Sequence, residues 1–141
     1  MRIVITGHRG QLGRQFELAF NAHDLLCMDL PAVDITSPQV TKQITDFRPD
    51  LVLHAAALTD VDGCEREPDR AFLVNAIGTK NVALGARAAG AAMVHISTNE
   101  VFPGSRREAY REWDSIDPIS VYARSKAAGE PIVREVSDRF F

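Results

Sequence analysis

The sequence predicts an α/β fold built on a doubly wound parallel sheet. Short apolar strands alternate with helical patterns along the whole chain, which is typical of a parallel sheet with helices on both faces. The run LVLH at 51–54 shows no polar alternation, as expected for a parallel strand buried on both sides. With 141 residues, the chain is expected to form one domain, 1–141.

Local signals set the bounds of the elements. Ser37-Pro38 starts one helix, because proline is favoured in the first helical turn, and Arg48-Pro49 ends it. Pro68 starts a longer helix that carries apolar side chains at helical spacing. Right-handed crossovers give the strand order 3-2-1-4-5. Strands are expected at 2–6, 24–28, near 32–35, 51–54 and 91–96, and helices at 11–21, 38–47, 68–89 and 119–138.

Three glycines follow the first strand directly and open the first helix. Gly7 permits a sharp turn, Gly10 lets the backbone approach a phosphate, and Gly13 lets the helix pack closely on the strand. The helix N-terminus offers unpaired N–H groups and the positive end of its dipole, which suits a pyrophosphate. A glycine triplet alone is a weak signal, but its place between strand and helix is typical of a Rossmann-type dinucleotide-binding domain.

Asp29 strengthens this interpretation. It ends the second strand, 22 residues after Gly7, where a carboxylate accepts hydrogen bonds from the adenosine ribose hydroxyls. A carboxylate there repels a 2′-phosphate and favours NAD, whereas Arg9 in the glycine loop is able to pair with that phosphate and favours NADP. A solvated loop charge explains Arg9 equally well. The choice between NADH and NADPH therefore stays open, with a lean toward use of both.

Tyr122 and Lys126 are the candidate acid–base pair. Their i, i+4 spacing puts a phenol and an ammonium on one helix face, where the cation stabilises a phenolate and makes the tyrosine a usable proton donor. Such pairs also arise by chance, as a half-buried aromatic beside a surface lysine. Thr98 follows the preceding strand at the edge where ligands bind, so its hydroxyl is a candidate to orient a carbonyl oxygen. Ser97 is the rival hydroxyl, because strand alternation lets only one of the two face the crevice.

Six motifs occur in order along essentially the whole chain. They are ITGHRGQLG at 5–13, RPD at 48–50, HAAALTDVD at 54–62, VNAIG at 74–78, VHISTNEVF at 94–102 and VYARSKAAGE at 121–130. Together they are specific: the chain resembles the extended short-chain dehydrogenase/reductases, and within them the dTDP-4-dehydrorhamnose reductase group.

The resemblance implies an oxidoreductase of deoxysugar (rhamnose-type) biosynthesis that uses NADPH or NADH. Hydride reaches the C4 ketone of a nucleotide-linked, dTDP-type 4-keto-6-deoxysugar. Tyr122 protonates the oxygen, Lys126 holds the nicotinamide ribose and Thr98 orients the ketone. Asn75 supports the active-site backbone. The cofactor contacts that the resemblance implies are Gly7, Arg9, Gly10, Gln11, Leu12, Gly13, Asp29, Asp34, Ile35, Ala55, Ala56, Ala57, Asn75, Tyr122 and Lys126.

The chain departs from the family pattern in three ways. Asn99-Glu100 stands where the family usually has Asp-Tyr, and Ala123 follows the tyrosine where glycine is common. Family members are about twice as long, so the chain corresponds to their N-terminal part, truncated before the last strands and the substrate domain. We therefore expect little or no turnover from these 141 residues alone. We also expect an apolar edge at the strand 91–96, which a homodimer would cover.

Composition argues against several other classes. A net charge of −3 without a basic stripe argues against nucleic-acid binding, and no apolar run reaches the roughly 18 residues of a membrane span. The N-terminus enters a strand directly, so no signal peptide is expected. Cys27 and Cys64 form no CxxC motif, which predicts free thiols in a reducing cytoplasm. The four histidines lack metal-ligand spacing, so no metal site is expected.

Two other functions stay open. One is a non-catalytic regulatory module that binds NAD(P), like the regulatory subunit of methionine adenosyltransferase, which resembles the same group. The presence of Thr98, Tyr122 and Lys126 together argues against it. The other is a nucleotide-sugar epimerase or dehydratase. A dehydratase usually has an acid directly after the threonine, and here Glu100 lies two residues on.

Overall fold

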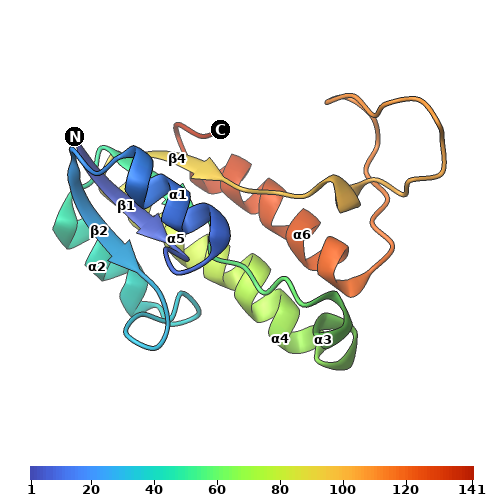
Figure 1. Cartoon of the computed structure of the whole chain (residues 1–141), viewed down its shortest axis with the longest axis horizontal. Coiled ribbons are helices and arrows are strands. Elements are labelled where there is room, and N and C mark those ends of the chain that lie inside the picture. Colours follow the sequence, from blue (N-terminus) through green and yellow to red (C-terminus); the bar gives the residue numbers. More distant parts are fainter.

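A computed structural model describes residues 1–141 as a four-stranded parallel sheet flanked by helices (Figure 1). The strands are β1 (Arg2–Thr6), β2 (Asp24–Met28), β3 (Leu51–His54) and β4 (Ala92–His95). The helices are α1 (Gln11–Ala19), α2 (Gln39–Phe47), α3 (Val61–Arg66), α4 (Pro68–Phe72), α5 (Thr79–Ala88) and α6 (Val121–Val136). A π-helical turn, η1 (Leu73–Gly78), joins α4 to α5, and a 3-10 turn, η2 (Asn99–Val101), follows β4. The predicted α/β Rossmann-type class is confirmed.

The sheet has the order β2-β1-β3-β4, and every neighbouring pair is parallel. This confirms the predicted order for all but one of the expected strands. The strand expected near 32–35 is wrong, because these residues form a turn in which Thr36 N–H donates to the Asp34 carboxylate at 2.9 Å. Pro31 has no N–H to offer a neighbouring strand, and the Asp34 side chain stabilises the turn, so no edge strand forms.

The two faces of the sheet are covered unequally. On one face Val4, Val52 and Met93 lie side by side in the strand register and pack in a core of 12 buried residues with side chains of α2, α5 and α6. On the other face Ile5 and Leu53 belong to a core of 3 buried residues, against which side chains of α1 pack. All strands point the same way, so the loops after their carboxyl ends gather at one edge of the sheet.

The end of the chain covers the outer edge of β4. Met93 N–H donates to the carbonyl oxygen of Arg139 at 2.9 Å, and His95 N–H donates to that of Phe141 at 2.9 Å. Phe140 forms a parallel bridge with Met93. The expectation of a bare β4 edge is therefore wrong, because the residues 139–141 add a short parallel segment there. A homodimer stays a prediction, but the need to cover the β4 edge no longer supports it.

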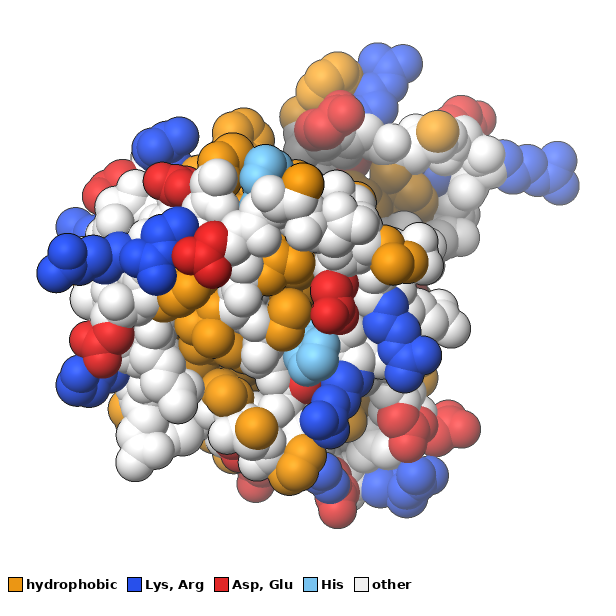
Figure 2. Space-filling view, turned by 60° about the vertical axis from the view of Figure 1, so that its left-hand side comes forward, with side chains coloured by type: hydrophobic (Ala, Val, Ile, Leu, Met, Phe, Trp, Pro, Cys, Tyr) orange, Lys and Arg blue, Asp and Glu red, His pale blue; other side chains and the backbone are white.

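Other differences from the predicted elements are local. The expected helix 68–89 is present, but η1 interrupts its α-helical repeat. Cys64 lies in α3, a short helix that is absent from the predicted elements. The segment 102–119 projects from the body of the molecule (Figure 1), and Trp113 on it is 74% exposed. Figure 2 shows positive and negative side chains interspersed around hydrophobic ones. None of the helices combines the length and the apolar character that crossing a membrane requires.

Candidate active site

Close backbone contacts hold the glycine loop between β1 and α1. Gly7 has φ +70°, and a Cβ there would lie 2.6 Å from the backbone nitrogen of Ala56. Only glycine fits such a position without strain. A Cβ at Gly13 would overlap the carbonyl oxygen of Gly7, so Gly13 permits close packing of the helix on the loop itself rather than on the strand. These glycines bring the start of α1 against the segment that follows β3.

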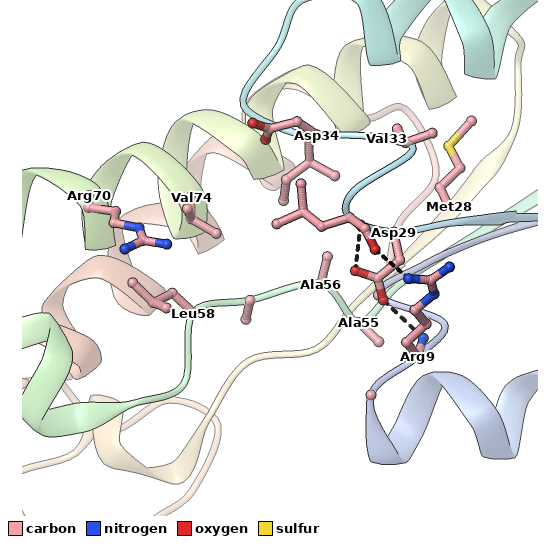
Figure 3. Close-up of a pocket in the computed structure, with 15 residues that line it drawn as sticks. Arg9, Met28, Asp29, Val33, Asp34, Ala55, Ala56, Leu58, Arg70 and Val74 are labelled. Carbon is pink, nitrogen blue, oxygen red and sulfur yellow. Dashed lines mark hydrogen bonds between the residues drawn. The ribbon is translucent and has the colours of Figure 1, made fainter.

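Asp29 ties the glycine loop to the end of β2 (Figure 3). Its carboxylate accepts hydrogen bonds from Arg9 N–H at 2.9 Å and Leu30 N–H at 2.8 Å. The Arg9 guanidinium donates through Nη1 to the carbonyl oxygen of Leu30 at 2.9 Å. Each carboxylate oxygen keeps a further lone pair, so Asp29 is still able to accept from a hydroxyl. Asp29, which favours NAD, and Arg9, which favours NADP, therefore lie side by side.

A first cavity, of about 420 Å³, opens beside this contact. Its walls are mostly apolar with a few polar groups, which suits a flat ring with attached hydroxyls. From the residues named in the sequence analysis it is lined by Gly7, Arg9, Gly10, Asp29, Asp34, Ile35, Ala55, Ala56 and Ala57. The residues that sequence reasoning missed are Met28, Leu30, Val33, Leu58, Arg70 and Val74.

Most of the missed residues are neighbours in sequence of residues that were named. Leu30 follows Asp29 directly and Val74 precedes Asn75, so proximity along the chain was a usable signal. Arg70 is different, because it reaches the cavity from α4 and belongs to none of the motifs. Only the packing of α4 beside the segment after β3 brings it there.

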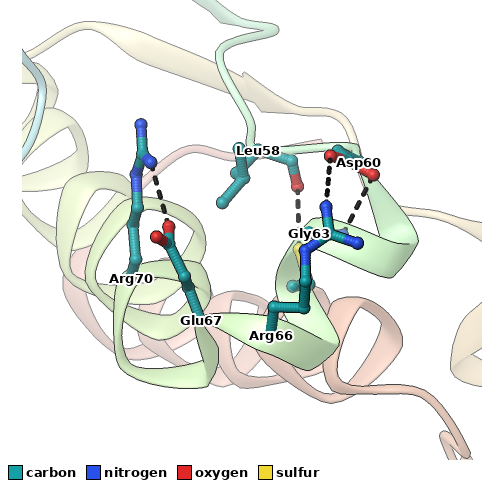
Figure 4. A network of polar contacts seen from close by, with 7 residues as sticks. Leu58, Asp60, Gly63, Arg66, Glu67 and Arg70 are labelled. Carbon is teal, nitrogen blue, oxygen red and sulfur yellow. Dashed lines mark hydrogen bonds and ion pairs between the residues drawn. The ribbon is translucent and has the colours of Figure 1, made fainter.

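A polar network on α3 and α4 borders this cavity (Figure 4). Asp60 caps α3 by accepting from Gly63 N–H at 3.0 Å, and it pairs with Arg66 at 3.7 Å. Glu67 accepts from Arg70 Nη1 at 3.0 Å. These ion-pair side chains are largely exposed, so they add little stability. The Glu67 contact nevertheless fixes the position of the Arg70 guanidinium at the cavity wall.

A second cavity, of about 460 Å³, lies on the other side of the glycine loop. It brings Tyr122 and Lys126 of α6 together with Gln11, Leu12 and Gly13 at the start of α1. The two cavities share Gly7, Gly10, Ala55 and Ala57, so they meet at the glycine loop. The remaining lining residues of the second cavity are Thr59, Ile96 and Ser97.

Lys126 is 4% exposed, and its ammonium donates to the carbonyl oxygen of Ile96 at 2.5 Å. Burial lowers the pKa of Lys126 to about 8, against the opposing effect of the Glu130 charge. Glu130, one turn further along α6, accepts a hydrogen bond from Ser97 Oγ at 2.5 Å. The lysine is therefore a fixed, desolvated cation at the carboxyl end of β4, still protonated for the most part at pH 7.

Behind Lys126 lies a buried histidine with a defined proton. His54 Nδ1 lies 2.6 Å from Thr6 Oγ1, and its Nε2 lies 2.9 Å from Thr79 Oγ1. The Thr79 hydroxyl donates its own proton to a backbone carbonyl one turn earlier at 2.7 Å, so toward His54 it only accepts. The proton of neutral His54 therefore sits on Nε2, and Thr6 donates to Nδ1. Burial lowers the pKa of His54 well below its usual value.

His95 stacks on His54, with ring centroids 5.5 Å apart. Both of its ring nitrogens are buried and have no hydrogen-bond partner. Burial, with a smaller contribution from the charge of Lys126, lowers the pKa of His95 to about 4. The histidine pair is therefore neutral at physiological pH, and Lys126 is the cation of this region.

The π-helical turn η1 places Asn75 under the segment that follows β3. Its side chain accepts from Leu58 N–H at 2.8 Å, donates to the Leu58 carbonyl oxygen at 3.0 Å and donates to Ser125 Oγ at 2.9 Å. Asn75 lines neither cavity, so it connects the floor of the first cavity to the helix that carries Tyr122 and Lys126. Wide turns of this kind are frequent near functional sites.

Thr98 lies outside both cavities. Its Oγ1 accepts a hydrogen bond from Glu100 N–H at 3.3 Å and so caps η2, whereas Ser97 lines the second cavity. Asn99 and Glu100 line a third cavity, of about 570 Å³, with residues of the projecting segment such as Tyr110. The structure thus brings the expected Tyr122 and Lys126 together, but Thr98 does not line their cavity.

Comparison with known proteins gives the family. The family model described as RmlD substrate binding domain matches residues 1–141, the whole chain. The chain belongs to this family. The resemblance drawn from the sequence motifs is thereby confirmed.

Relatives of the RmlD family match over nearly all of this chain. The spore coat polysaccharide biosynthesis protein SpsK of Bacillus subtilis is 37% identical over 94% of this chain and 48% of its own length. A dTDP-4-dehydrorhamnose reductase of Aggregatibacter actinomycetemcomitans is 38% identical over 98% of this chain and 48% of its own length. The chain therefore spans about half the length of the curated relatives it matches.

A solved structure agrees with the fold in detail. The dTDP-4-dehydrorhamnose reductase of Bacillus anthracis, in complex with NADP, superposes with a TM-score of 0.95 at 42% sequence identity. The match covers 99% of this chain and 51% of that one. A UDP-glucose 4-epimerase of Thermus thermophilus in complex with NAD gives a TM-score of 0.84 at 27% identity.

Proposed function

We propose that the protein is a cytoplasmic NAD(P)H-dependent reductase of the C4 ketone of a dTDP-linked 4-keto-6-deoxysugar. The observation that carries this proposal is the second cavity, which is lined by the glycine loop together with Tyr122 and Lys126. The relatives named dTDP-4-dehydrorhamnose reductase support the substrate class.

The residues present fit a dinucleotide. The positive φ of Gly7 and the absence of side chains at Gly7 and Gly10 leave the backbone bare where a diphosphate approaches the start of α1. The two cavities that meet there have room for a nucleoside on each side. When bound, the cofactor supplies a hydride to the ketone carbon. We propose that NADH and NADPH both bind, because two amide donors offset the Asp29 charge and Arg9 lies beside it.

Tyr122 supplies the proton for the reaction. As the ketone carbon accepts hydride, the phenol of Tyr122 gives its proton to the carbonyl oxygen and the product is an alcohol. The phenolate left behind is stabilised by the buried Lys126 ammonium and regains a proton from solvent. Thr98 is the proposed orienting hydroxyl, by the family pattern. Ser97 is the alternative, by its place in the second cavity.

The position of Glu100 favours a reductase over a dehydratase. Glu100 lines the third cavity, and neither Tyr122 nor Lys126 is part of that cavity. A dehydratase acid would need to face the same sugar ring as the tyrosine.

The first experiment is calorimetric titration of the protein with NADPH and with NADH. We expect micromolar binding of both, a selective loss of NADPH affinity in Arg9→Gln, and a selective gain of NADPH affinity in Asp29→Asn. If neither NADPH nor NADH bound, the proposed cofactor site would be wrong.

The second experiment measures NADPH oxidation with a dTDP-linked 4-keto-6-deoxysugar. It compares this chain with a chimera in which the second half of the Bacillus anthracis reductase follows Phe141. We expect turnover in the chimera, a loss of at least about 100-fold in Tyr122→Phe, and unchanged NADPH affinity in that variant. Thr98→Val and Ser97→Ala then identify the orienting hydroxyl. Cofactor binding without turnover in the chimera would favour the non-catalytic regulatory module.

A further inference from the structure

Three side chains with metal-binding atoms converge beside α1. His8 comes from the glycine loop, Glu17 from α1 and Cys27 from β2. Their ligand atoms all lie within 4.8 Å of one another, and His8 Nδ1 is 3.5 Å from Glu17 Oε2. Neither the proposed reductase chemistry nor the two cavities that would serve it uses any of the three.

The distances suit a tetrahedral ion. Zinc binds imidazole nitrogen and carboxylate oxygen at about 2.0–2.2 Å and thiolate sulfur at about 2.3 Å, so two ligands of one ion lie roughly 3.3–3.8 Å apart. The His8–Glu17 separation of 3.5 Å already falls in this range. The separations from Cys27 Sγ to the other two ligand atoms are at most 4.8 Å, and small side-chain rotations of the half-buried His8 and the exposed Glu17 would bring all three atoms to one ion.

The ligand types select the class of cation. One thiol, one imidazole and one carboxylate form a mixed set that zinc accepts, whereas magnesium and calcium require oxygen ligands throughout. Cys27 is held by the β1–β2 pairing, opposite Ile5, so its position is set by the sheet. His8 and Cys27 are half-buried and Glu17 is exposed, which leaves the outer side open to a water molecule.

We propose that His8, Glu17 and Cys27 bind a zinc-class divalent cation, with water as the fourth ligand. The ion joins the glycine loop to α1 and β2 and so restrains the loop next to Gly7. The expectation of no metal site rested on spacing along the sequence. The three ligands are spread over 20 positions and meet only because β1, α1 and β2 form one compact unit.

Cobalt(II) titration of the purified protein, after removal of metals with a chelator, tests this site. A thiolate bound to cobalt gives a near-ultraviolet charge-transfer absorption that histidine and carboxylate ligands do not give. We expect this absorption in the wild-type protein, its displacement by zinc, and its loss in Cys27→Ser. Cys64→Ser, which removes the other thiol, is the matched control and should keep it.

Substitution of the half-buried His8 or the exposed Glu17 tests the site without changing the buried core. We expect His8→Gln and Glu17→Gln each to weaken zinc binding at least tenfold, while His23→Gln at an exposed site leaves it unchanged. At the same zinc concentration, the thermal midpoint should also rise more in the wild-type protein than in Glu17→Gln. Absence of the thiolate absorption in the wild-type protein, or its persistence in Cys27→Ser, would overturn the proposal.

Discussion

The first and second cavities meet at the same glycine loop but are built by different means. The first is closed by backbone contacts and by Asp29, whose partners lie next to it on the loop and at the end of β2. The second takes its chemical groups, Tyr122 and Lys126, from α6, more than 100 residues along the chain. α6 is held in place by buried polar contacts such as the bond between Asn75 and Ser125.

Different forces therefore shape the two halves of the site. Steric rules that act over a few residues shape the glycine-loop side of the first cavity, whereas Leu58, Arg70 and Val74 reach it from later in the chain. Adding single atoms to the loop should therefore damage the loop side. Long-range packing determines the second cavity, so its failure should follow from removing a buried partner far from Tyr122 in sequence. Substitutions of the two kinds therefore separate the halves.

The largest effect is expected for Gly13→Ala. The added Cβ would overlap the carbonyl oxygen of Gly7, so α1 or the loop has to move, with a loss of about 1–3 kcal/mol in unfolding free energy. Because both cavities share this loop, we expect NADPH affinity to fall by about 100-fold, roughly 2.7 kcal/mol. Gly10→Ala is the control, since its Cβ would lie 3.2 Å from the nearest atom. An equal loss of stability in Gly10→Ala would contradict this explanation.

Two buried asparagines, Asn75 and Asn81, each support a different part of the site. Asn75→Ala removes three hydrogen bonds, two to the half-buried backbone of Leu58 and one to Ser125 Oγ, so we expect a loss of about 3 kcal/mol in urea denaturation. Asn81→Ala removes two bonds, to the carbonyl oxygens of Ile35 and Thr36, and should cost about 1–2 kcal/mol.

The two variants should also differ in function. In the catalytically complete chimera, Asn75→Ala should reduce turnover as well as NADPH affinity, because Asn75 joins Leu58 of the first cavity to Ser125 on the helix that carries Tyr122. Asn81→Ala should reduce NADPH affinity more than turnover, because Ile35 lines the first cavity. The reverse pattern would show that the two cavities are not separately supported.

Many of the residues named from the sequence line the first cavity, because the determinants of its glycine-loop side are local. The glycine spacing, Asp29 and the apolar strands each report a steric or hydrogen-bonding need of their own neighbourhood. The same local reasoning placed a strand at 32–35 and missed that Pro31 and Asp34 favour a turn there.

Tertiary packing decides what the sequence does not predict. The i, i+4 spacing brings Tyr122 and Lys126 to one helix face, but it does not say whether Ser97 or Thr98 faces them. Nothing in the pattern of the long helix predicts the π-helical turn that places Asn75, nor the approach of Arg70 to the first cavity. The same holds for the convergence of His8 and Cys27, which depends on how α1 lies against β2.

An effect specific to the second cavity is the pH dependence caused by Lys126. Its pKa is about 8 in the folded protein, against 10.5 in the unfolded chain, so between these values the unfolded chain binds more protons. Unfolding free energy should therefore rise as pH increases from 8 to 10.5, by an amount on the order of 3 kcal/mol. Lys126→Met should lack this rise, whereas Lys80→Met at an exposed site should keep it. Urea denaturation at several pH values measures the difference.

The smallest effect is expected for His95→Phe, which keeps a ring against His54 and removes two unpaired buried nitrogens. Stability at pH 7 should change by less than about 1 kcal/mol, because no hydrogen bond is lost. In the wild-type protein the pKa of His95 is about 4, below the value of 6.5 in the unfolded chain, so stability falls as pH drops through that window. Between pH 6.5 and pH 4, the unfolding free energy of His95→Phe should fall less steeply than that of the wild-type protein. The control His23→Gln should keep the wild-type slope. A clear destabilisation at pH 7 with an unchanged acid slope would mean that the His95 nitrogens do have a partner behind Lys126.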